Sequence, residues 1–304
     1  MDLQQLRCFL AVAEELHFGR AAERLHMSAS PVSRTVKDLE RELEVELFLR
    51  SYHQVELTPA GLELARRVRP LVAQLDRLPN DIRLIAAGDA AVVHLGGSHL
   101  APPAILDTVV ECAERGSPGR TVEVDLAPSS ELLPRLSRSE LDAVVVHLPV
   151  DDPGVATLPL ASYRFYIVMR RIDPLAARPS LSLGELADRT VVTMSTSVQP
   201  RAMQQWHDDL IGGGLQHLKH LKGTDTSMIA AHVRRTGDLA ISTSPDNGGP
   251  ARVFDDPAFV LVPLTDQPRF AIGLAWLADR ADDDVVAGTI AAIRDRWTDG
   301  EIQL

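Results

Sequence analysis

The chain has 304 residues, of which 45% are hydrophobic, and its formal net charge is -11. This length suits two packed domains, and the hydrophobic content is ample for their cores. No apolar run approaches the ~20 residues needed to cross a bilayer, and no basic leader precedes an apolar segment at the start, so we expect a cytoplasmic protein without a membrane partner. The two cysteines, Cys8 and Cys112, argue against a disulfide framework or a cysteine-rich metal site.

An apolar pattern near the N-terminus predicts a short helix, a tight turn and a second helix. The residues that recur at helical spacing are Phe18, Ala21, Ala22 and Leu25. They predict a helix over residues 18–26. Ser28 can then cap the free amides of a new helix that starts near Ala29, and Pro31 is tolerated because it falls within the first turn.

The second helix is predicted to have one buried face and one face suited to DNA. Val32, Val36 and Leu39 repeat at helical spacing on the buried face. Small or basic side chains on the other face and around it can lie against bases and phosphates in a major groove. The candidate DNA contacts are Arg20, Ala29, Ser30, Pro31, Ser33, Arg34, Thr35, Lys37, Arg50 and His53. A surface helix of any three-helix domain remains an alternative, because helical pairs with a four-residue connection are common.

Several motifs in residues 1–61 stand at a characteristic spacing. They are LxxFLAVAEE, FGRAAERLHMS, the Ser33–Arg34 pair, the Leu39–Glu40 pair, ELFLR and LTPAG. In sequence and spacing this stretch resembles the DNA-binding domain of the LysR-type transcriptional regulators. The resemblance implies a winged helix-turn-helix domain over residues 1–58, rich in α-helix, and double-stranded promoter DNA as its partner.

The chain departs from the family pattern at two places. The family usually has Gln and Pro after the capping serine, where this chain has Ala29 and Ser30. The family's wing is often rich in arginine, and this chain offers only Arg50 and His53 there. The operator sequence therefore does not transfer from a relative.

The DNA-binding stretch is acidic overall. Residues 1–58 carry 7 basic and 10 acidic side chains, a net charge of -3, whereas DNA binders are expected to be locally basic. We predict weak nonspecific binding and a strong dependence on dimerisation, because each phosphate contact adds affinity only through local counterion release.

A long helix is predicted to follow. Thr58 and Pro59 form a helix-start signal, and Pro70 and Pro79 are expected to kink or interrupt the helix. The apolar residues at spacings of three and four are Leu62, Ala65, Val68, Leu71, Val72 and Leu75. This narrow stripe suits antiparallel pairing with a second copy, although a core helix of one globular domain has the same pattern. The resemblance implies a dimerising linker helix over residues 59–88 and a homodimer or homotetramer.

From residue 89 the pattern changes to alternating strands and helices. Strands are predicted at residues 92–97, 121–127, 141–148, 165–169, 190–194, 238–243 and 270–277. The β-α-β-α-β order at the start implies a parallel sheet with helices on both faces. We expect a two-lobed α/β effector domain over residues 89–304, with lobe I at 89–161 and 269–304 and lobe II at 162–268. The resemblance implies a hinged cleft like that of periplasmic solute-binding proteins.

Serines and threonines follow several of these strands, at the sheet edge where ligands bind in open α/β folds. Free amides at helix starts favour anions. From this placement and the resemblance, the candidate effector contacts are Ser98, His99, Leu100, Ser129, Ser130, His147, Thr196, Ser197 and Val198. A capping hydroxyl also occurs at most helix starts for stability alone.

His217 and His220 have a spacing that could bind a metal if they lay on a helix, but no third ligand is nearby in the sequence. We therefore expect no metal and no cofactor.

These patterns predict a transcriptional regulator in which a small anionic metabolite in the cleft modulates promoter binding or activation, with RNA polymerase as a further partner. The alternative is a small-molecule α/β enzyme with an accessory DNA-binding-like domain. The sequence offers it neither a G-x-S-x-G nucleophile elbow nor a phosphate loop. A solute-binding protein is a third option, which the missing export signal disfavours.

Overall fold

The computed structural model describes residues 1–50, 55–87, 92–222, 225–266, 268, 270–297 and 302–303. It divides into two compact units, Met1–Asp89 with Ser137–Glu140, and Ala90–Leu136 with Leu141–Leu304. The helices are α1 (Leu3–Glu15), α2 (Phe18–Arg24), α3 (Ala29–Leu43), α4 (Pro59–Ala87), α5 (Pro103–Gly116), α6 (Ser129–Ser137), α7 (Pro200–Gly212), α8 (Thr226–Thr236) and α9 (Asp284–Arg296).

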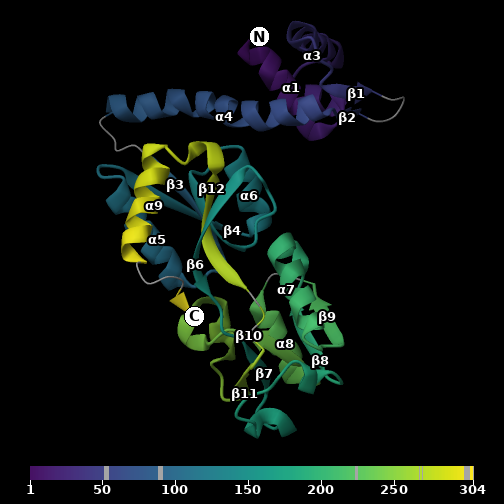
Figure 1. The fold of residues 1–304 in the computed structure, drawn as a ribbon, viewed down its shortest axis with the longest axis vertical. Coiled ribbons are helices and arrows are strands. Elements are labelled where there is room, and N and C mark those ends of the chain that lie inside the picture. The colour runs from purple at the N-terminus through teal and green to yellow at the C-terminus, as the bar shows by residue number, and fades with distance from the viewer. Residues whose placement is uncertain are drawn as a thin grey trace. The chain divides into compact units, whose positions relative to one another are not determined.

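The strands are β1 (Phe48–Arg50), β2 (Val55–Leu57), β3 (Val92–Ser98), β4 (Thr121–Ala127), β5 (Ala143–Leu148), β6 (Val155–Ser162), β7 (Tyr166–Arg170), β8 (Thr190–Met194), β9 (His217–Leu221), β10 (Leu239–Ser242), β11 (Phe259–Pro263), β12 (Ala271–Leu277) and β13 (Ile302–Gln303). Figure 1 shows these elements along the chain. Within the described residues, none of the helices has the length and apolar character needed to cross a bilayer.

Helices α1 to α3 pack around a common apolar core that contains Phe9, Val36 and Leu39. Helix α2 ends at Arg24, two residues before the predicted end. Ser28 occupies the N-cap position of α3 as expected, but its side chain makes no capping hydrogen bond.

The wing begins with a short antiparallel pair in which Phe48 of β1 lies opposite Leu57 of β2. The Glu40 carboxylate accepts hydrogen bonds from the backbone amides of Leu47 (3.0 Å) and Phe48 (3.2 Å), which fixes the start of β1 against α3. Leu47 and Phe48 are buried, whereas Val45 is 44% exposed, because the chain turns out of α3 at Glu44 just before it.

Helix α4 spans 29 residues and continues through Pro70 and Pro79. The Thr58 hydroxyl accepts a hydrogen bond from the Gly61 amide at 3.0 Å, so the predicted cap is confirmed. The predicted apolar stripe divides between two faces. Its buried members, which pack on the core of the N-terminal unit, are Ala65, Val68 and Val72. Among the described side chains of α4, the large apolar residues that are exposed are Leu62, Leu71, Leu75, Leu78 and Ile82.

The second unit contains a six-stranded sheet with strand order β13-β6-β12-β5-β3-β4. Strand β3 pairs in parallel with β4 and β5, as the sequence predicts, and the return strand β12 runs antiparallel to β5 and β6. Helices α5 and α9 lie together on one face of this sheet and α6 on the other (Figure 1). Helices α5 and α9 approach each other so closely at Gly116 that an added Cβ there would lie only 2.3 Å from the carbonyl carbon of Gly288.

The other sheet has five strands in the order β11-β7-β10-β8-β9. Helix α8 packs on one face through Ile229 and Val233. Helix α7 contributes Trp206 and Leu210 to a hydrophobic cluster that includes residues of both sheets. The chain passes between the sheets after β6 and again after β11, so the predicted two-lobed α/β class is confirmed.

The segment that holds His217 and His220 forms strand β9 and not a helix. Residues three apart in a strand point to opposite faces of the sheet. The idea that both imidazoles could face one metal on a helix is therefore wrong.

Candidate functional site

The outer face of α3 presents the predicted DNA-contacting residues to solvent. Exposed positions on this helix are Ala29, Ser30, Pro31, Arg34 and Lys37. Neither Arg34 nor Lys37 forms an ion pair with any residue that the structure describes. The two cations are thus free to meet phosphates, which bind through charge.

The other predicted DNA contacts are placed less freely. Ser33 and Thr35 are half-buried on α3. Arg20 is exposed, and its Nε lies 3.3 Å from Oε2 of Glu15. Arg50 lies in β1, and His53 falls outside the described residues.

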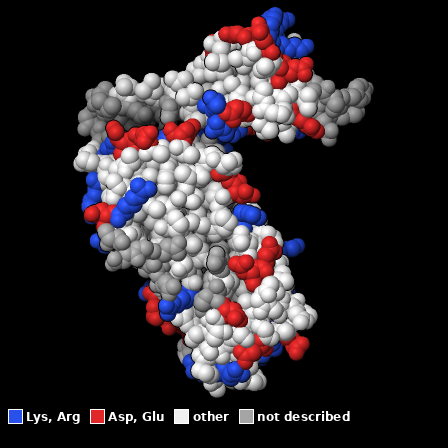
Figure 2. Space-filling model, in the orientation of Figure 1, with Lys and Arg blue, Asp and Glu red and all other residues white. Residues whose placement is uncertain are grey.

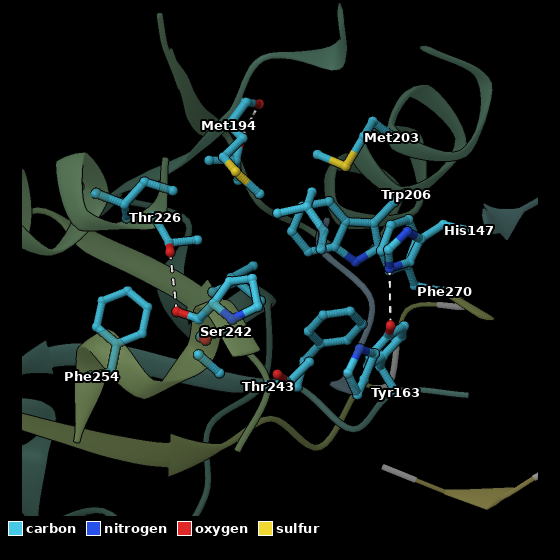
Figure 3. A pocket seen from close by; sticks show the side chains of 18 of the residues that line it. His147, Tyr163, Met194, Met203, Trp206, Thr226, Ser242, Thr243, Phe254 and Phe270 are labelled. Carbon is cyan, nitrogen blue, oxygen red and sulfur yellow. Dashed lines mark hydrogen bonds between the residues drawn. The ribbon is translucent and has the colours of Figure 1, made fainter. Parts of the chain in front are cut away.

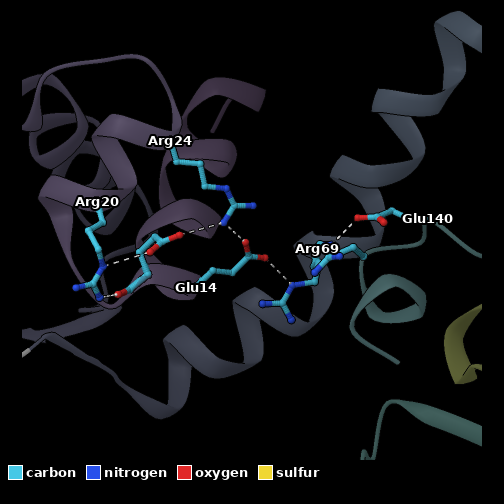
Figure 4. A network of polar contacts seen from close by, with 7 residues as sticks. Glu14, Arg20, Arg24, Arg69 and Glu140 are labelled. Atoms are coloured by element: carbon cyan, nitrogen blue, oxygen red, sulfur yellow. Dashed lines mark hydrogen bonds and ion pairs between the residues drawn. The ribbon is translucent and has the colours of Figure 1, made fainter. Parts of the chain in front are cut away.

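Glu14 of α1 connects three helices of the N-terminal unit. Its carboxylate lies 2.5 Å from Nη1 of Arg24 in α2 and 3.2 Å from Nε of Arg69 in α4 (Figure 4). Paired in this way, Arg24 and Arg69 are less available to DNA than Arg34 and Lys37. Figure 2 shows Lys and Arg intermixed with Asp and Glu where Figure 1 places α3, which agrees with the net acidic count of this region.

The second unit contains a cavity of about 110 Å³ whose lining comes from both lobes (Figure 3). The aromatic lining residues are His147, Tyr163, Phe165, Trp206, Phe254 and Phe270. The hydroxyl-bearing lining residues, besides Tyr163, are Thr193, Thr226, Ser242 and Thr243. We call this cavity the aromatic pocket.

Five of the rings form one contact group, in which the His147 ring is stacked 4.7 Å from Phe270. The centroid of Phe165 lies 5.3 Å from that of Trp206 and 6.1 Å from that of Phe270, and the Tyr163 ring lies 5.8 Å from Phe270. Aromatic pairs at these separations attract each other beyond the effect of buried area alone. The pocket wall is therefore held by ring contacts that span α7, the chain after β6 and the chain before β12.

His147 is held in one protonation state. Its Nδ1 lies 2.9 Å from Oε1 of Gln199, and Gln199 Nε2 donates to the His147 carbonyl at 2.7 Å. The amide oxygen therefore accepts, so Nδ1 carries the proton and Nε2 accepts from the Tyr163 hydroxyl at 3.0 Å. Burial lowers the pKa of His147 to about 4, which leaves the imidazole neutral near pH 7.

The structure brings only part of the predicted effector set to this pocket. Leu100 and His147 line it. Next to Leu100, the Ser98 hydroxyl accepts from the Leu100 amide at 3.4 Å. Both ring nitrogens of His99 are buried without a hydrogen-bonding partner among the described residues.

The remaining predicted contacts do not line the aromatic pocket, so far as their side chains are described. Ser129 is fully buried and begins α6, whereas Ser130 is exposed. Thr196, Ser197 and Val198 form a short 3-10 helix, in which Ser195 caps the Ser197 amide.

Sequence reasoning missed the aromatic lining and Gln199. Positions 165 and 270 are the first residues of predicted strands, and position 163 lies just before one, so their rings resemble ordinary core residues. Gln199 precedes Pro200 at the start of α7, which is a helix-start signal but gives no hint of its bond to His147.

Comparisons with known proteins agree over both units. Residues 3–62 match the bacterial regulatory helix-turn-helix protein of the lysR family, and residues 86–298 match the LysR substrate binding domain. The HTH-type transcriptional regulator IlvR of Caulobacter vibrioides is 32% identical over 292 residues, which cover 92% of this chain and 94% of IlvR. XapR of Escherichia coli, also an HTH-type transcriptional regulator, is 36% identical over 194 residues, 64% of this chain and 66% of XapR.

Solved structures extend the likeness to the whole fold. A full-length OxyR variant from Pseudomonas aeruginosa aligns with a TM-score of 0.59 and 25% identity over 97% of this chain and 95% of that chain. Full-length CbnR in complex with its target DNA aligns with a TM-score of 0.55 and 20% identity over 97% of this chain and 99% of that chain. The named relatives are regulators and not enzymes. Because two family descriptions together span most of the sequence and fit its two folded units, the chain belongs to the LysR family of transcriptional regulators.

Proposed function

We propose that this protein binds promoter DNA through α3 and that a small molecule in the effector domain changes promoter binding or activation. The observation that carries the proposal is the outer face of α3, where Arg34 and Lys37 stand free of acidic partners among the described residues. Cations on an exposed recognition helix are the groups that neutralise DNA phosphates. The CbnR structure with its target DNA supports this use of the shared fold.

The contacts divide by chemistry. Arg34 and Lys37 bind phosphates, and Ser30 and Ser33 read base edges, because hydroxyls can donate to or accept from several bases. The other proposed contacts around α3 and the wing are Arg20, Ala29, Pro31, Thr35, Arg50 and His53.

Ligand binding belongs to the second unit. The aromatic pocket takes the effector against Leu100 and His147. The remaining proposed contacts along the cleft are Ser98, His99, Ser129, Ser130, Thr196, Ser197 and Val198.

The protein acts as a homodimer or homotetramer in the cytoplasm, where the DNA is. Support for pairing comes from four exposed apolar residues of α4 at spacings of four, three and four: Leu71, Leu75, Leu78 and Ile82. An apolar stripe at this spacing is typical of helices that pair with a second copy. RNA polymerase is the proposed partner in activation.

A gel-shift titration on the DNA upstream of the protein's own coding region tests the proposal, with unlabelled competitor and a salt series. We expect specific binding at moderate salt, and the Arg34→Ala variant to bind less tightly. Arg41→Ala is the matched control, because Arg41 lies in the last turn of the same helix and pairs with Asp38. Failure to retain any genomic fragment in a genome-wide pull-down with the intact oligomer would contradict the proposal.

A further inference from the structure

We propose that the aromatic pocket selects an uncharged, ring-containing molecule that carries a hydrogen-bonding group, and that it rejects carboxylates of the same size. The inference rests on the proposed effector role of this pocket and names the chemical class that it takes. It departs from the anionic effector that the serine-rich strand ends favour.

The described lining of the pocket holds no ionised partner for an anion. None of its described residues is Lys, Arg, Asp or Glu. His147 is the one titratable cation-forming group among them, and both of its ring nitrogens are already bonded, to Gln199 and to Tyr163. A carboxylate placed here would lose its hydration without gaining a cation, which is strongly unfavourable.

The helix that begins beside the pocket does not supply the missing positive charge. Thr226, the first residue of α8, lines the cavity. However, the Asp225 carboxylate already caps this helix by accepting from the Ser227 amide at 2.8 Å. Hydrogen bonds from Ser227 keep the pKa of Asp225 below its usual value, so the cap is ionised and repels a second anion.

The size and walls of the cavity suit one ring. Its volume of about 110 Å³ is of the same order as the ~150 Å³ engineered apolar cavity that binds benzene. Phe165, Trp206 and Phe270 supply ring faces and edges within about 6 Å of each other, which is the separation at which aromatic groups pack favourably.

Polar groups around the pocket favour a ligand that carries a hydrogen-bonding group. Trp206 is only 5% exposed, and its indole Nε1 has no hydrogen-bonding partner among the residues that the structure describes. Ser242 and Thr243 line the same cavity, and their hydroxyls bond to no residue that the structure describes. A buried donor left unpaired is costly, so a ligand oxygen that accepts from Trp206 is favoured over a plain hydrocarbon.

Direct binding of small ring compounds to the full-length protein tests this class. Calorimetric titrations at pH 7.5 would compare benzamide with benzoate, two molecules of nearly equal shape that differ in charge, and add toluene, which has no polar group. We expect benzamide to bind at least about tenfold more tightly than benzoate and more tightly than toluene. Benzoate binding as tightly as benzamide, or no benzamide binding at millimolar concentration, would overturn the proposal.

Two tryptophan variants locate the binding site. Trp206→Phe keeps a ring but removes the indole donor, so benzamide should bind about tenfold more weakly. Trp276→Phe is the matched control. Trp276 is also buried, and its Nε1 has no partner in the described part of the chain, but it lies in β12 outside the pocket lining, so benzamide affinity should not change. An equal effect of both substitutions would place the ligand elsewhere.

These titrations contain no DNA, so they separate this inference from the proposed function. If the protein binds its promoter but prefers benzoate to benzamide, the proposed regulatory function stands and the proposed ligand class is wrong. If the protein binds benzamide but no genomic DNA, the ligand class stands and the proposed regulatory function is wrong.

Discussion

His147 and Gln199 exchange two hydrogen bonds, one of 2.9 Å between the side chains and one of 2.7 Å from the Gln199 amide to the His147 carbonyl. His147 lies in β5 of the six-stranded sheet, and Gln199 immediately precedes α7 beside the five-stranded sheet. The two lobes are thus joined at the wall of the aromatic pocket. A ligand that moves His147 therefore acts directly on the contact that relates the lobes.

Removing the Gln199 side chain tests the strength of this contact. Gln199→Ala should lower the free energy of unfolding of the effector domain by about 2 kcal/mol, because it leaves a buried imidazole N–H and a carbonyl without partners. Urea unfolding followed by tryptophan fluorescence reports on this unit, since Trp206, Trp276 and Trp297 all lie in it. Gln204→Ala, at an exposed position of α7, should change stability by less than about 0.5 kcal/mol. Equal effects of the two changes would contradict a buried His147–Gln199 contact.

Acid should destabilise the effector domain through its buried histidines. The pKa of His147 is about 4 in the folded protein and about 6.5 in an unfolded chain. Between these values the unfolded chain binds a proton that the folded protein does not. The contribution of neutral His147 to the free energy of unfolding is therefore fully present above pH 6.5 and is lost as the pH drops towards 4. The contribution of His147 reaches about 3 kcal/mol.

Unfolding free energies at a series of pH values check this. His147→Gln should flatten the dependence without abolishing it, because desolvation also lowers the pKa of His207 to about 4. Gln204→Ala, at an exposed position of α7, should leave the dependence as it is. A wild-type protein whose stability is the same at pH 5 and pH 7.5 would refute the assigned shift.

The contact between α5 and α9 should tolerate no side chain at Gly116. A methyl group there would meet the Gly288 backbone at 2.3 Å, so Gly116→Ala should destabilise the effector domain by about 2 kcal/mol through overpacking. At Gly212 in α7 an added Cβ would meet nothing within 4 Å. Gly212→Ala should therefore be neutral or slightly stabilising, by up to about 1 kcal/mol. Thermal unfolding of both variants gives the comparison, and a stable Gly116→Ala protein would disprove the close approach.

Salt dependence should separate phosphate contacts from base contacts on α3. Arg34→Ala should weaken binding to all DNA sequences and reduce the slope of log affinity against log salt by about 1. Changes at Ser30 or Ser33 should shift sequence preference while they leave that slope nearly unchanged. Affinity measurements on a specific and a scrambled site over a salt series distinguish the two. An equal loss at every site for all three variants would contradict this division of roles.

The N-terminal helices could be predicted because their signals are local. Val32, Val36 and Leu39 show the helical period within eight residues, and all three are buried in α3. The start of α4 is equally predictable, because Thr58 and Pro59 are adjacent in the sequence and the Thr58 hydroxyl accepts from the Gly61 amide only three residues further on.

The pocket could be predicted only in part, because it depends on contacts between distant segments. His147 was identified from its place at a strand end, but its partners lie 16 and 52 residues further along the chain. No local pattern reports such a distance. The segment 217–221 was misjudged for a different reason: Leu218 and Leu221 are three residues apart, a spacing that suits a helix, whereas the segment forms an edge strand.

The ion pairs that Glu14 makes with Arg24 and Arg69 couple the DNA-binding helices to α4. Glu14 thereby joins α1, α2 and the first part of α4, so we expect the DNA-binding helices to move together with that part of α4. The 29 residues of α4 correspond to a length of about 43 Å at 1.5 Å per residue. If a helix of this length tilts by only about 5° about one end, the other end moves by about 4 Å, which is close to the ~3.4 Å step between neighbouring base pairs. If two copies pair through α4, a change of a few degrees in the crossing angle of the two helices would therefore shift the spacing of the two DNA-binding domains by about one base pair.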